Sequence, residues 1–534
     1  MINTQVSRVS RFLLGLRIGK SIDKDSYGFM VRNKKRFGKK KPGTSSGVVL
    51  VGIFDYPILT YCYASVLNWL SRKKGISIRS YSFTPKCDPV VKSVYESFGA
   101  RLGLSRKQLS AFKKVSEIKA DSIFSQIKTK WDVLNIRESG IRIGDLIYDS
   151  YLRYYSEVTV KISDVRLKGL ICEALMVLDA SLEYMQKNKV VAFIADDYGY
   201  IHGGVPTRVA MSLEIPVFLV CFGPKFFIYQ MFGEKETNWH DYPIRWPFHQ
   251  YHKLFSEMPA EKQKAAISIG NAHVNGKLSG VIDKFTLETI TAYGASKGRV
   301  LEANDKPKML VLMHDFFDSP HGYRTMLFPD FYDWIHFLLK EAEQTEFEWY
   351  IKPHPCVWDE KAGTINAQNS GIIEELKAKY KFLKWLKPQT SNRQLVDEGI
   401  STVFTVYGTA GHEFAYLGVP VVNAGDNPHI AYSFNFHPST IEEYSYLISC
   451  ADKLKIHVQK QEIDEYCYMN YFYFPEKYST PANPIGNGFY SHPNSNALYT
   501  QRSSYPLFMA EESALRDSYL NDYYQAVFSK VNSR

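Results

Sequence analysis

The sequence predicts an α/β protein of two domains, each built around a largely parallel sheet, with a basic extension ahead of the first. A chain of 534 residues is too long for one ordinary hydrophobic core, so two domains are expected. Nearly continuous apolar runs, such as VVLVGIF at 48–54, are typical of strands that helices cover on both faces. Strand-like and helix-like segments also alternate along the chain, which is the order of βαβ units.

The first domain is expected over residues 44–295, after a Gly/Ser-rich hinge. The run at 48–54 is its first strand, and the helix that follows ends at Gly75. Further strands are predicted in ISIRSYSF, VVAFIAD and IPVFLVC, and further helices at 105–130, 141–155, 164–188 and 204–214. Residues 222–300 are rich in aromatic residues and turns, and are expected to cover a site or to connect the domains.

A linker is expected at 296–306 and a second α/β domain at 307–460. Its strands are predicted in KMLVLMH, FEWYIKP, STVFTVYG and VPVVNAG, with helices in FPDFYDWIHFLLKEAEQ, GIIEELKAKY and TAGHEFAYLG. Residues 461–534 combine a Pro/Asn/Gly-rich loop with helical segments that are expected to pack back on the first domain. Two such units would face each other across a cleft, and open α/β sheets bind ligands beyond the carboxyl ends of their strands.

The formal net charge of +10 is concentrated in the basic extension, residues 1–43. This segment holds twelve Lys or Arg against Asp23 and Asp25, so the rest of the chain is nearly neutral. Nucleic-acid binding would need a basic groove in the folded part, and is therefore not expected. Two interpretations of the extension stay open. VSRFLLGLRIGKSI can form an amphipathic helix, with Phe12, Leu13, Leu16 and Ile18 against Arg11, Arg17 and Lys20, that lies on an anionic membrane. It can also be a solvated tail.

Cysteine usage and hydropathy point to a cytoplasmic protein. Seven scattered cysteines without a CxxC pair argue against a disulfide framework or a structural zinc site, and they fit a reducing compartment. No apolar run reaches the length of a membrane span. The N-terminus lacks the sustained apolar core and small-residue cleavage site of a signal peptide, so none is expected.

The segment TVYGTAGHEFAYLGVPVVNAG, residues 405–425, is the strongest indication of a nucleotide site. A strand runs into Gly408 and Thr409 and then into a helix, whose free backbone N–H groups and positive dipole end suit a phosphate. Glu413 lies one turn along, where its carboxylate can accept hydrogen bonds from vicinal sugar or ribose hydroxyls. The alternative is a capped helix with Glu413 as a surface charge.

Two further strand ends offer polar side chains to the same edge of the sheet. One strand stops at Lys352-Pro353-His354-Pro355, where the prolines stiffen His354, and both cationic groups can face a phosphate. A rigid turn is the alternative. His314 and Asp315 end the first strand of the second domain, with His314 expected at the nucleotide and Asp315 at the substrate. The spacing of His314, Asp315 and His321 matches no helical metal motif, so no metal site is predicted.

Carboxylates follow two strands of the first domain. Asp55 follows the strand at 48–54, and Asp196 and Asp197 follow VVAFI within ADDYGYIHGGVPTR. A carboxylate at such a strand end can act as a general base, Asp197 first and Asp55 second. Asp196, His202 and Arg208 are candidates for binding the acceptor or a donor carboxylate. Helix capping by aspartate and a Gly-rich turn are the alternative.

Five segments taken together resemble bacterial glycosyltransferases of capsule and surface-polysaccharide biosynthesis. They are IRIGDLIYDSYLR, DDYGYIHGGVPTRVA, LFPDFYDWI, IKPHP and GTAGHEFAYLGVPVVNAG, and the resemblance covers roughly residues 45–445. It implies the GT-B architecture, two Rossmann-like domains facing a cleft, here with C-terminal helices and the basic N-terminal extension.

The resemblance extends more loosely to sialyltransferases, Kdo transferases and wall-teichoic glycerophosphotransferases. In these enzymes a His-Pro element engages the phosphate of a CMP or CDP donor, a role that falls on His354 here, and the hydroxyl at the helix start falls on Thr409. Sialyltransferase-like families also carry a catalytic acidic-acidic-Gly element ahead of the His-Pro element. Here Asp397-Glu398-Gly399 comes after it, so the role of base is not transferred to this element.

These observations predict a glycosyltransferase, metal-independent and without a cofactor other than its nucleotide-sugar co-substrate. Its donor, for which a CMP-linked acidic sugar such as Kdo is favoured, would bind Lys352, His354, Gly408, Thr409, Glu413 and His314. Its acceptor would be an oligosaccharide or lipid-linked glycan of capsule or lipopolysaccharide, met in the cytoplasm or at the inner face of the cytoplasmic membrane. The alternatives are a CDP-glycerol-type polyol-phosphate transferase, a sugar-nucleotide epimerase, and a non-catalytic subunit of a glycan-assembly complex.

Overall fold

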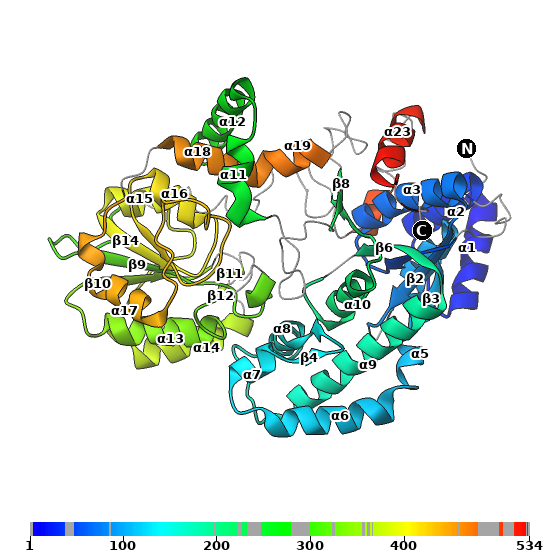
Figure 1. The fold of residues 1–534 in the computed structure, drawn as a ribbon, viewed down its shortest axis with the longest axis horizontal. Coiled ribbons are helices and arrows are strands. Elements are labelled where there is room, and N and C mark those ends of the chain that lie inside the picture. The colour runs from blue at the N-terminus through cyan, green and yellow to red at the C-terminus, as the bar shows by residue number, and fades with distance from the viewer. Residues whose placement is uncertain are drawn as a thin grey trace.

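The computed structural model describes most of the chain. The described residues are 4–37, 47–84, 87–195, 198–221, 227–231, 247–278, 298–322, 326–354, 358–359, 364–365, 367–456, 460–478, 501–505, 517–529 and 531. Two α/β domains lie at opposite ends of the molecule, and a group of helices lies between them at the top of Figure 1.

The first domain contains a six-stranded sheet in the order β3-β2-β1-β6-β7-β8. Five strands run parallel, and β8 joins the edge antiparallel to β7. Third, second, first, fourth, fifth is the strand order of a Rossmann sheet. The bounds are β1 (Val48–Gly52), β2 (Ser77–Ser82), β3 (Arg101–Ser105), β6 (Val190–Ala195), β7 (Val217–Cys221) and β8 (Phe227–Gln230).

Helices cover both faces of this sheet, which explains the apolar run at its centre. Val49 and Val51 of β1 enter one core, and Leu50 between them enters the other, so each residue needs an apolar side chain. The first core lies under α2 (Lys24–Phe37), α3 (Pro57–Lys74) and α4 (Pro89–Ser97). Helices of the second face are α5 (Arg106–Leu109), α6 (Lys113–Gln126), α7 (Lys130–Leu134), α8 (Gly144–Tyr155), α9 (Val165–Lys187) and α10 (Ile201–Ser212).

The second domain repeats this plan with five parallel strands in the order β13-β10-β9-β14-β15. Its strands are β9 (Lys308–Leu312), β10 (Glu348–Lys352), β13 (Lys384–Trp385), β14 (Ile400–Thr405) and β15 (Val421–Asn423). Its helices are α13 (Phe331–Ala342), α14 (Ala367–Lys379), α15 (Asn392–Asp397), α16 (Ala410–Tyr416) and α17 (Ile441–Ser449). Two Rossmann-like domains confirm the predicted GT-B fold class.

A helical group packs against the second domain beside α16. Its members are α11 (Tyr251–Ser256), α12 (Ala260–Leu278), α18 (Lys460–Tyr468), the π-helical turn η6 (Met469–Tyr473) and α19 (Phe474–Tyr478). Tyr466 of α18 shares a core with Tyr416 of α16, and Asn271 of α12 hydrogen-bonds Asp464 of α18 at 3.1 Å. Residues on both sides of the expected linker 296–306 therefore meet on one surface of the second domain, as Figure 1 shows.

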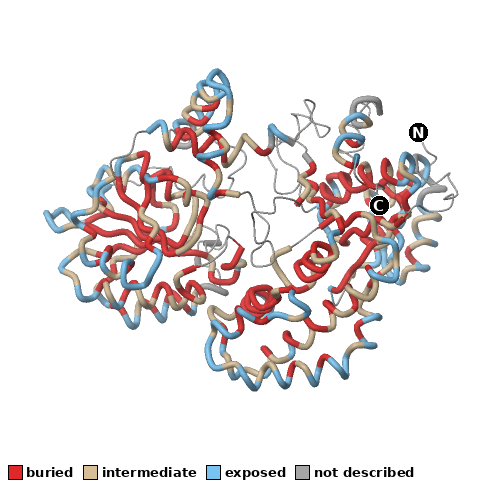
Figure 2. Tube along the Cα trace, in the orientation of Figure 1, coloured by how far each residue is buried: buried red, intermediate tan, exposed pale blue. Residues whose placement is uncertain are grey.

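Both ends of the chain pack on the first domain. The basic extension forms α1 (Thr4–Ile18) and α2, and α2 buries Phe29 and Met30 in the first core. Phe29 stacks on Tyr505 with 4.3 Å between the ring centroids. Near the C-terminus, α23 (Asp517–Val527) packs on α3, where Tyr524 contacts Trp69 edge to face. Figure 2 shows buried residues lining both sheets and the helices between them.

Several elements differ from the sequence-based expectations, because β3, β8, β13, α4 and α15 are not predicted and one expected helix is divided. β3 is not predicted because its sequence, RLGLS, is short and contains Gly103, a residue that strands disfavour. The helix expected over 105–130 is divided into α5, which begins with a capping box between Ser105 and Gln108, and α6.

Candidate functional site

In the second sheet, the order in which strands are added along the chain reverses between β9 and β14. The predicted motifs lie at this switch point. β9 is followed by His314, β10 by His354, and β14 by Gly408 and Thr409. In Rossmann-like sheets, ligands bind beyond the carboxyl ends of the strands at this switch point. The structure therefore brings the three motifs, which are far apart in the sequence, to one edge of the sheet.

His314 joins the ends of the two central strands. Its Nε2 accepts a hydrogen bond from the backbone N–H of Val406 at 3.1 Å and lies 3.0 Å from Thr405 Oγ1. The ring is buried and stacks on Phe331 at 4.5 Å between centroids. Burial and, to a smaller extent, nearby His354 together lower the pKa of His314 to about 3. A neutral ring carries its proton on Nδ1, so His314 fixes the backbone just before Gly408.

Gly408 shapes the turn into α16. Its φ is +137°, a backbone conformation that L-residues rarely adopt, and the space that a Cβ would fill is open. Thr409 stands at the N-cap position, but its hydroxyl accepts no capping bond from the helix. α16 spans only seven residues, so its dipole is small, and a ligand here would depend on individual backbone and side-chain groups.

Lys352 and Glu413 are joined by a residue that the sequence does not single out, Asn392. Lys352 Nζ donates to Thr390 O and to Asn392 Oδ1, both at 2.7 Å, and Asn392 Nδ2 donates to Glu413 Oε2 at 3.0 Å. All three side chains are buried. Burial lowers the pKa of Lys352 to about 8, against the opposing effect of Glu413. Lys352 thus lies beneath the edge of the sheet and orients Glu413, whereas the sequence predicts that it faces a phosphate.

Asp315 and the loop after it reach the first domain. Asp315 Oδ1 accepts from Phe317 N at 3.1 Å and so closes a tight turn. Three residues after Asp315, the same loop presents Asp318, whose Oδ1 accepts a hydrogen bond from Tyr200 OH at 3.2 Å. Tyr200 precedes α10 of the first domain, so this edge of the second domain adjoins the segment after β6.

The predicted carboxylates of the first domain follow β1 and β6, the two strands at its own switch point. Asp55 follows β1 and is half-exposed, and its Oδ2 pairs with Arg502 at 3.1 Å. Arg502 also binds Asp88 at 2.7 Å, so Asp55 belongs to an ion-pair cluster at the C-terminal segment. Asp196 and Asp197 follow β6 directly and lie outside the described residues.

His202 and Arg208 face different neighbours from those the sequence suggests. His202 Nδ1 lies 3.2 Å from Tyr154 OH, and its Nε2 lies 3.1 Å from Glu173. Arg208 is buried in α10, where both terminal nitrogens bind the carboxylate of Asp145 at 2.7 and 2.6 Å. Arg208 and Arg142 overcome the effect of burial and hold the pKa of Asp145 at about 2. The guanidinium of Arg208 is therefore committed to the fold and not directed at a ligand.

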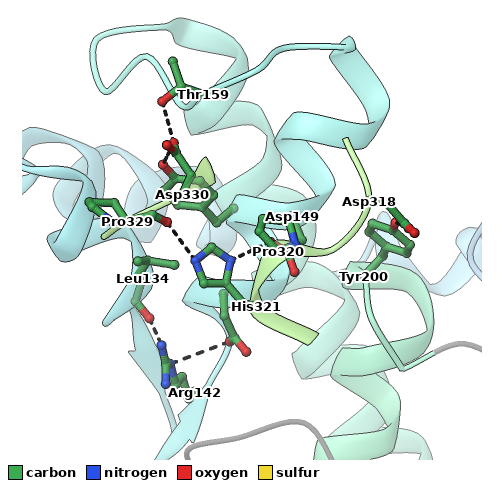
Figure 3. A network of polar contacts seen from close by, with 12 residues as sticks. Leu134, Arg142, Asp149, Thr159, Tyr200, Asp318, Pro320, His321, Pro329 and Asp330 are labelled. Atoms are coloured by element: carbon green, nitrogen blue, oxygen red, sulfur yellow. Dashed lines mark hydrogen bonds and ion pairs between the residues drawn. The ribbon is translucent and has the colours of Figure 1, made fainter. Parts of the chain in front are cut away.

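A buried polar network connects the two domains just beside this edge (Figure 3). Asp330, the N-cap of α13, accepts hydrogen bonds from Asp333 N, Tyr148 OH and Thr159 OH. Nearby, His321 follows the loop of Asp315 and contacts Asp149 of α8 at 2.6 Å.

The ring of His321 makes contacts on both sides. Its Nε2 donates to Pro329 O at 2.9 Å, and Asp149 raises the pKa of the buried ring. Asp330 and Asp149 thus hold α8 of the first domain against α13 and the loop of the second. The sequence analysis does not single out Asp330, although this residue lies within LFPDFYDWI.

Two negative findings apply to the part of the chain that the structure describes. No three His, Cys, Asp or Glu side chains there lie close enough together to hold a metal ion. None of its helices has the length and apolar character needed to cross a bilayer.

No family model and no curated protein matches this chain. Among solved structures, UDP-GlcNAc 2-epimerase from Neisseria meningitidis bound to UDP-GlcNAc is 11% identical with a TM-score of 0.26, covering 80% of this chain and 95% of its own.

Two further structures show likenesses of similar size. A UDP-N-acetylglucosamine 2-epimerase from Rickettsia bellii is 13% identical with a TM-score of 0.24, covering 79% of this chain and 92% of its own. An O-GlcNAc transferase variant from Thermobaculum terrenum is 8% identical with a TM-score of 0.21, covering 96% and 74%. Likenesses with such low TM-scores decide nothing about activity, so the fold rests on the two strand orders and the site on its own geometry.

Proposed function

We propose that the protein is a glycosyltransferase that moves a sugar from a nucleotide-sugar donor to a growing bacterial surface polysaccharide, such as capsule or lipopolysaccharide. A CMP-linked acidic sugar such as Kdo is the favoured donor, an oligosaccharide or lipid-linked glycan is the acceptor, and the cytoplasm is the location. One observation carries the proposal. Three separate sequence motifs, which follow β9, β10 and β14, meet at the switch point of the second sheet and are tied together by hydrogen bonds.

The donor would lie across this edge, with its phosphate near His354 and the turn at Gly408. His354 supplies a hydrogen-bond donor or a positive charge where the leaving phosphate gains negative charge in the transition state. The open space at Gly408 allows the phosphate to approach the backbone closely. Glu413, oriented by Asn392, would accept hydrogen bonds from hydroxyls of the ribose or the sugar.

The acceptor would enter from the first domain, which contacts the second domain through the hydrogen bond from Tyr200, five residues after the end of β6, to Asp318. The acceptor hydroxyl attacks the anomeric carbon, the bond from that carbon to the phosphate oxygen breaks, and the hydroxyl proton passes to a carboxylate. Asp197 is the proposed base. Asp55 is second, because its carboxylate already pairs with Arg502.

Binding and hydrolysis of CMP-, CDP-, UDP- and GDP-linked donors by the full-length protein test this function. One class of nucleotide should bind, and His354→Ala should weaken that binding at least about tenfold, which corresponds to one lost charge-assisted hydrogen bond. His252→Ala is a matched control, because His252 lies on the surface of α11 with its side chain 64% exposed.

Each outcome has a defined meaning. If the protein transfers a polyol phosphate from a CDP-linked donor, the transferred group is that polyol phosphate and not a sugar, and the proposed donor site still holds. Conversion of a nucleotide sugar without any acceptor would identify an epimerase. Absence of nucleotide binding by the folded wild-type protein would refute the transferase and favour a non-catalytic glycan-assembly subunit.

A further inference from the structure

The first helix of the extension carries an apolar face that neither the fold nor the proposed reaction uses. Val9, Phe12, Leu13 and Leu16 of α1 are 60%, 65%, 58% and 64% exposed. Their spacing of three, four and seven residues places them on one stripe of the helix, at about 100° per residue. Single exposed apolar side chains are common on soluble proteins, but a contiguous stripe of four marks an interaction surface.

The opposite face of α1 attaches it to the first domain. Leu14 and Ile18 pack against the core that contains Phe29 of α2. After α1, Lys20 pairs with Asp88 at 2.9 Å, and α2 is itself buried under Tyr505. This packing leaves the apolar stripe exposed on the opposite side of α1, and Figure 1 shows α1 at the edge of the molecule.

The charges around the stripe indicate what covers it. Residues 4–20 contain Arg8, Arg11, Arg17 and Lys20 and no Asp or Glu. At about 100° per residue, Arg8 lies on one side of the stripe and Arg17 on the other, and both are exposed. A second copy of the chain on this face would bring cations of like sign together, which is unfavourable. An anionic surface is complementary to this arrangement.

We propose that α1 docks the protein on the surface of a membrane that contains anionic lipids. Val9, Phe12, Leu13 and Leu16 enter the boundary between headgroups and acyl chains, while Arg8 and Arg17 lie beside lipid phosphates. The helix lies in the plane of the membrane. This inference is independent of the proposed reaction, because no residue of the candidate site belongs to α1.

Sedimentation of the full-length protein with vesicles tests the proposal. Vesicles of equal parts phosphatidylcholine and phosphatidylglycerol should bind the wild-type protein, and vesicles of phosphatidylcholine alone should bind it much less. The double variant Phe12→Ser, Leu16→Ser should lower partitioning into the anionic vesicles at least about tenfold, because two apolar side chains no longer enter the lipid. Arg8→Gln, Arg17→Gln should also weaken binding and reduce its dependence on salt.

The matched control is Val115→Ser, Ile118→Ser on α6, which removes side chains that are 55% and 64% exposed on another surface. It should partition like the wild type, and all variants should keep the wild-type melting temperature because every substituted side chain is exposed. The proposal is refuted if the wild type does not bind anionic vesicles, or if the α1 and α6 variants bind equally. A wild-type dimer in light scattering that the α1 variant abolishes would instead assign the stripe to a second copy of the chain.

Discussion

Arg208→Met should destabilise the first domain strongly, without weakening the binding of either substrate to the protein that remains folded. The side chains of Arg208 and Asp145 are only 5% and 4% exposed, and two hydrogen bonds join them. After the substitution, Arg142 remains, with its Nε 3.7 Å from Asp145 Oδ1. Removing one partner of a buried ion pair typically costs about 3–5 kcal/mol, a large part of the usual stability of a domain.

Urea unfolding followed by circular dichroism measures this loss, and a second substitution identifies its cause. Asp145→Asn combined with Arg208→Met removes both charges of this pair, so the double variant should recover about 2 kcal/mol relative to Arg208→Met alone. The folded-state pKa of Asp145, about 2, lies below its ordinary value of 3.8. The pair therefore stabilises the wild type above about pH 4, and this contribution is lost as pH falls toward 2. The double variant should lack this acid-dependent loss.

The outcome that contradicts this reasoning is specific. Arg208→Met would have to lower the free energy of unfolding by less than about 1 kcal/mol, which is the contribution of an exposed ion pair. It would at the same time have to raise KM for an acceptor or donor. Arg208 would then be a ligand-binding residue, as its position in the sequence first suggests.

Three further predictions concern the contact between the domains and the edge of the second sheet. The double variant His321→Gln, Asp149→Asn should flatten the dependence of melting temperature on pH, because it removes both titrating groups of this buried pair. Against the effect of burial, Asp149 raises the pKa of His321, so the wild type is stabilised below the ordinary pKa of histidine and loses this stabilisation as pH rises through the raised value. Lys352→Met should lower donor affinity, because Asn392 loses the partner that fixes its orientation toward Glu413, and calorimetry with the nucleotide checks this; unchanged affinity would remove Lys352 from the site. Gly408→Val should lower the free energy of unfolding, measured in urea, by about 1–3 kcal/mol, because a valine is strained at a φ of +137°. The same substitution should abolish donor binding. A variant that binds the donor normally would exclude an approach of the phosphate to this turn.

The fold class was predictable because strand burial leaves a direct mark on the sequence. Val49, Leu50 and Val51 alternate between two cores, so each of these residues must be apolar, and the residues of β6 alternate in the same way. In β14, Val403 and Phe404 also enter different cores, although this strand contains Ser and Thr as well. β3 does not have a continuous apolar sequence, because it contains Gly103 and two exposed residues at the edge of the sheet. The placement of α11 and α12 beside α18 was not predictable, because pairing between segments so far apart depends on tertiary packing and not on local pattern.

The residues of the candidate site that follow the strands were predictable, and the residues that orient them were not. The motifs around His314, His354 and Gly408 meet because parallel strands end at one edge. Asn392 carries no motif, since its role depends on a single amide placed between two buried charges. Arg208 looks like a ligand-binding residue in the sequence, and only its burial against Asp145 shows otherwise.

Hydrogen–deuterium exchange of the full-length protein, with and without CMP, CDP, UDP or GDP, tests the central claim most directly. That claim is that the motifs following β9, β10 and β14 form one nucleotide site in the second domain. At least one nucleotide should slow exchange in peptides that contain residues 313–315, 352–354 and 406–413 together, while peptides from α6 stay unchanged. Protection confined to the first domain, or no protection by any nucleotide at saturating concentration, would contradict the claim.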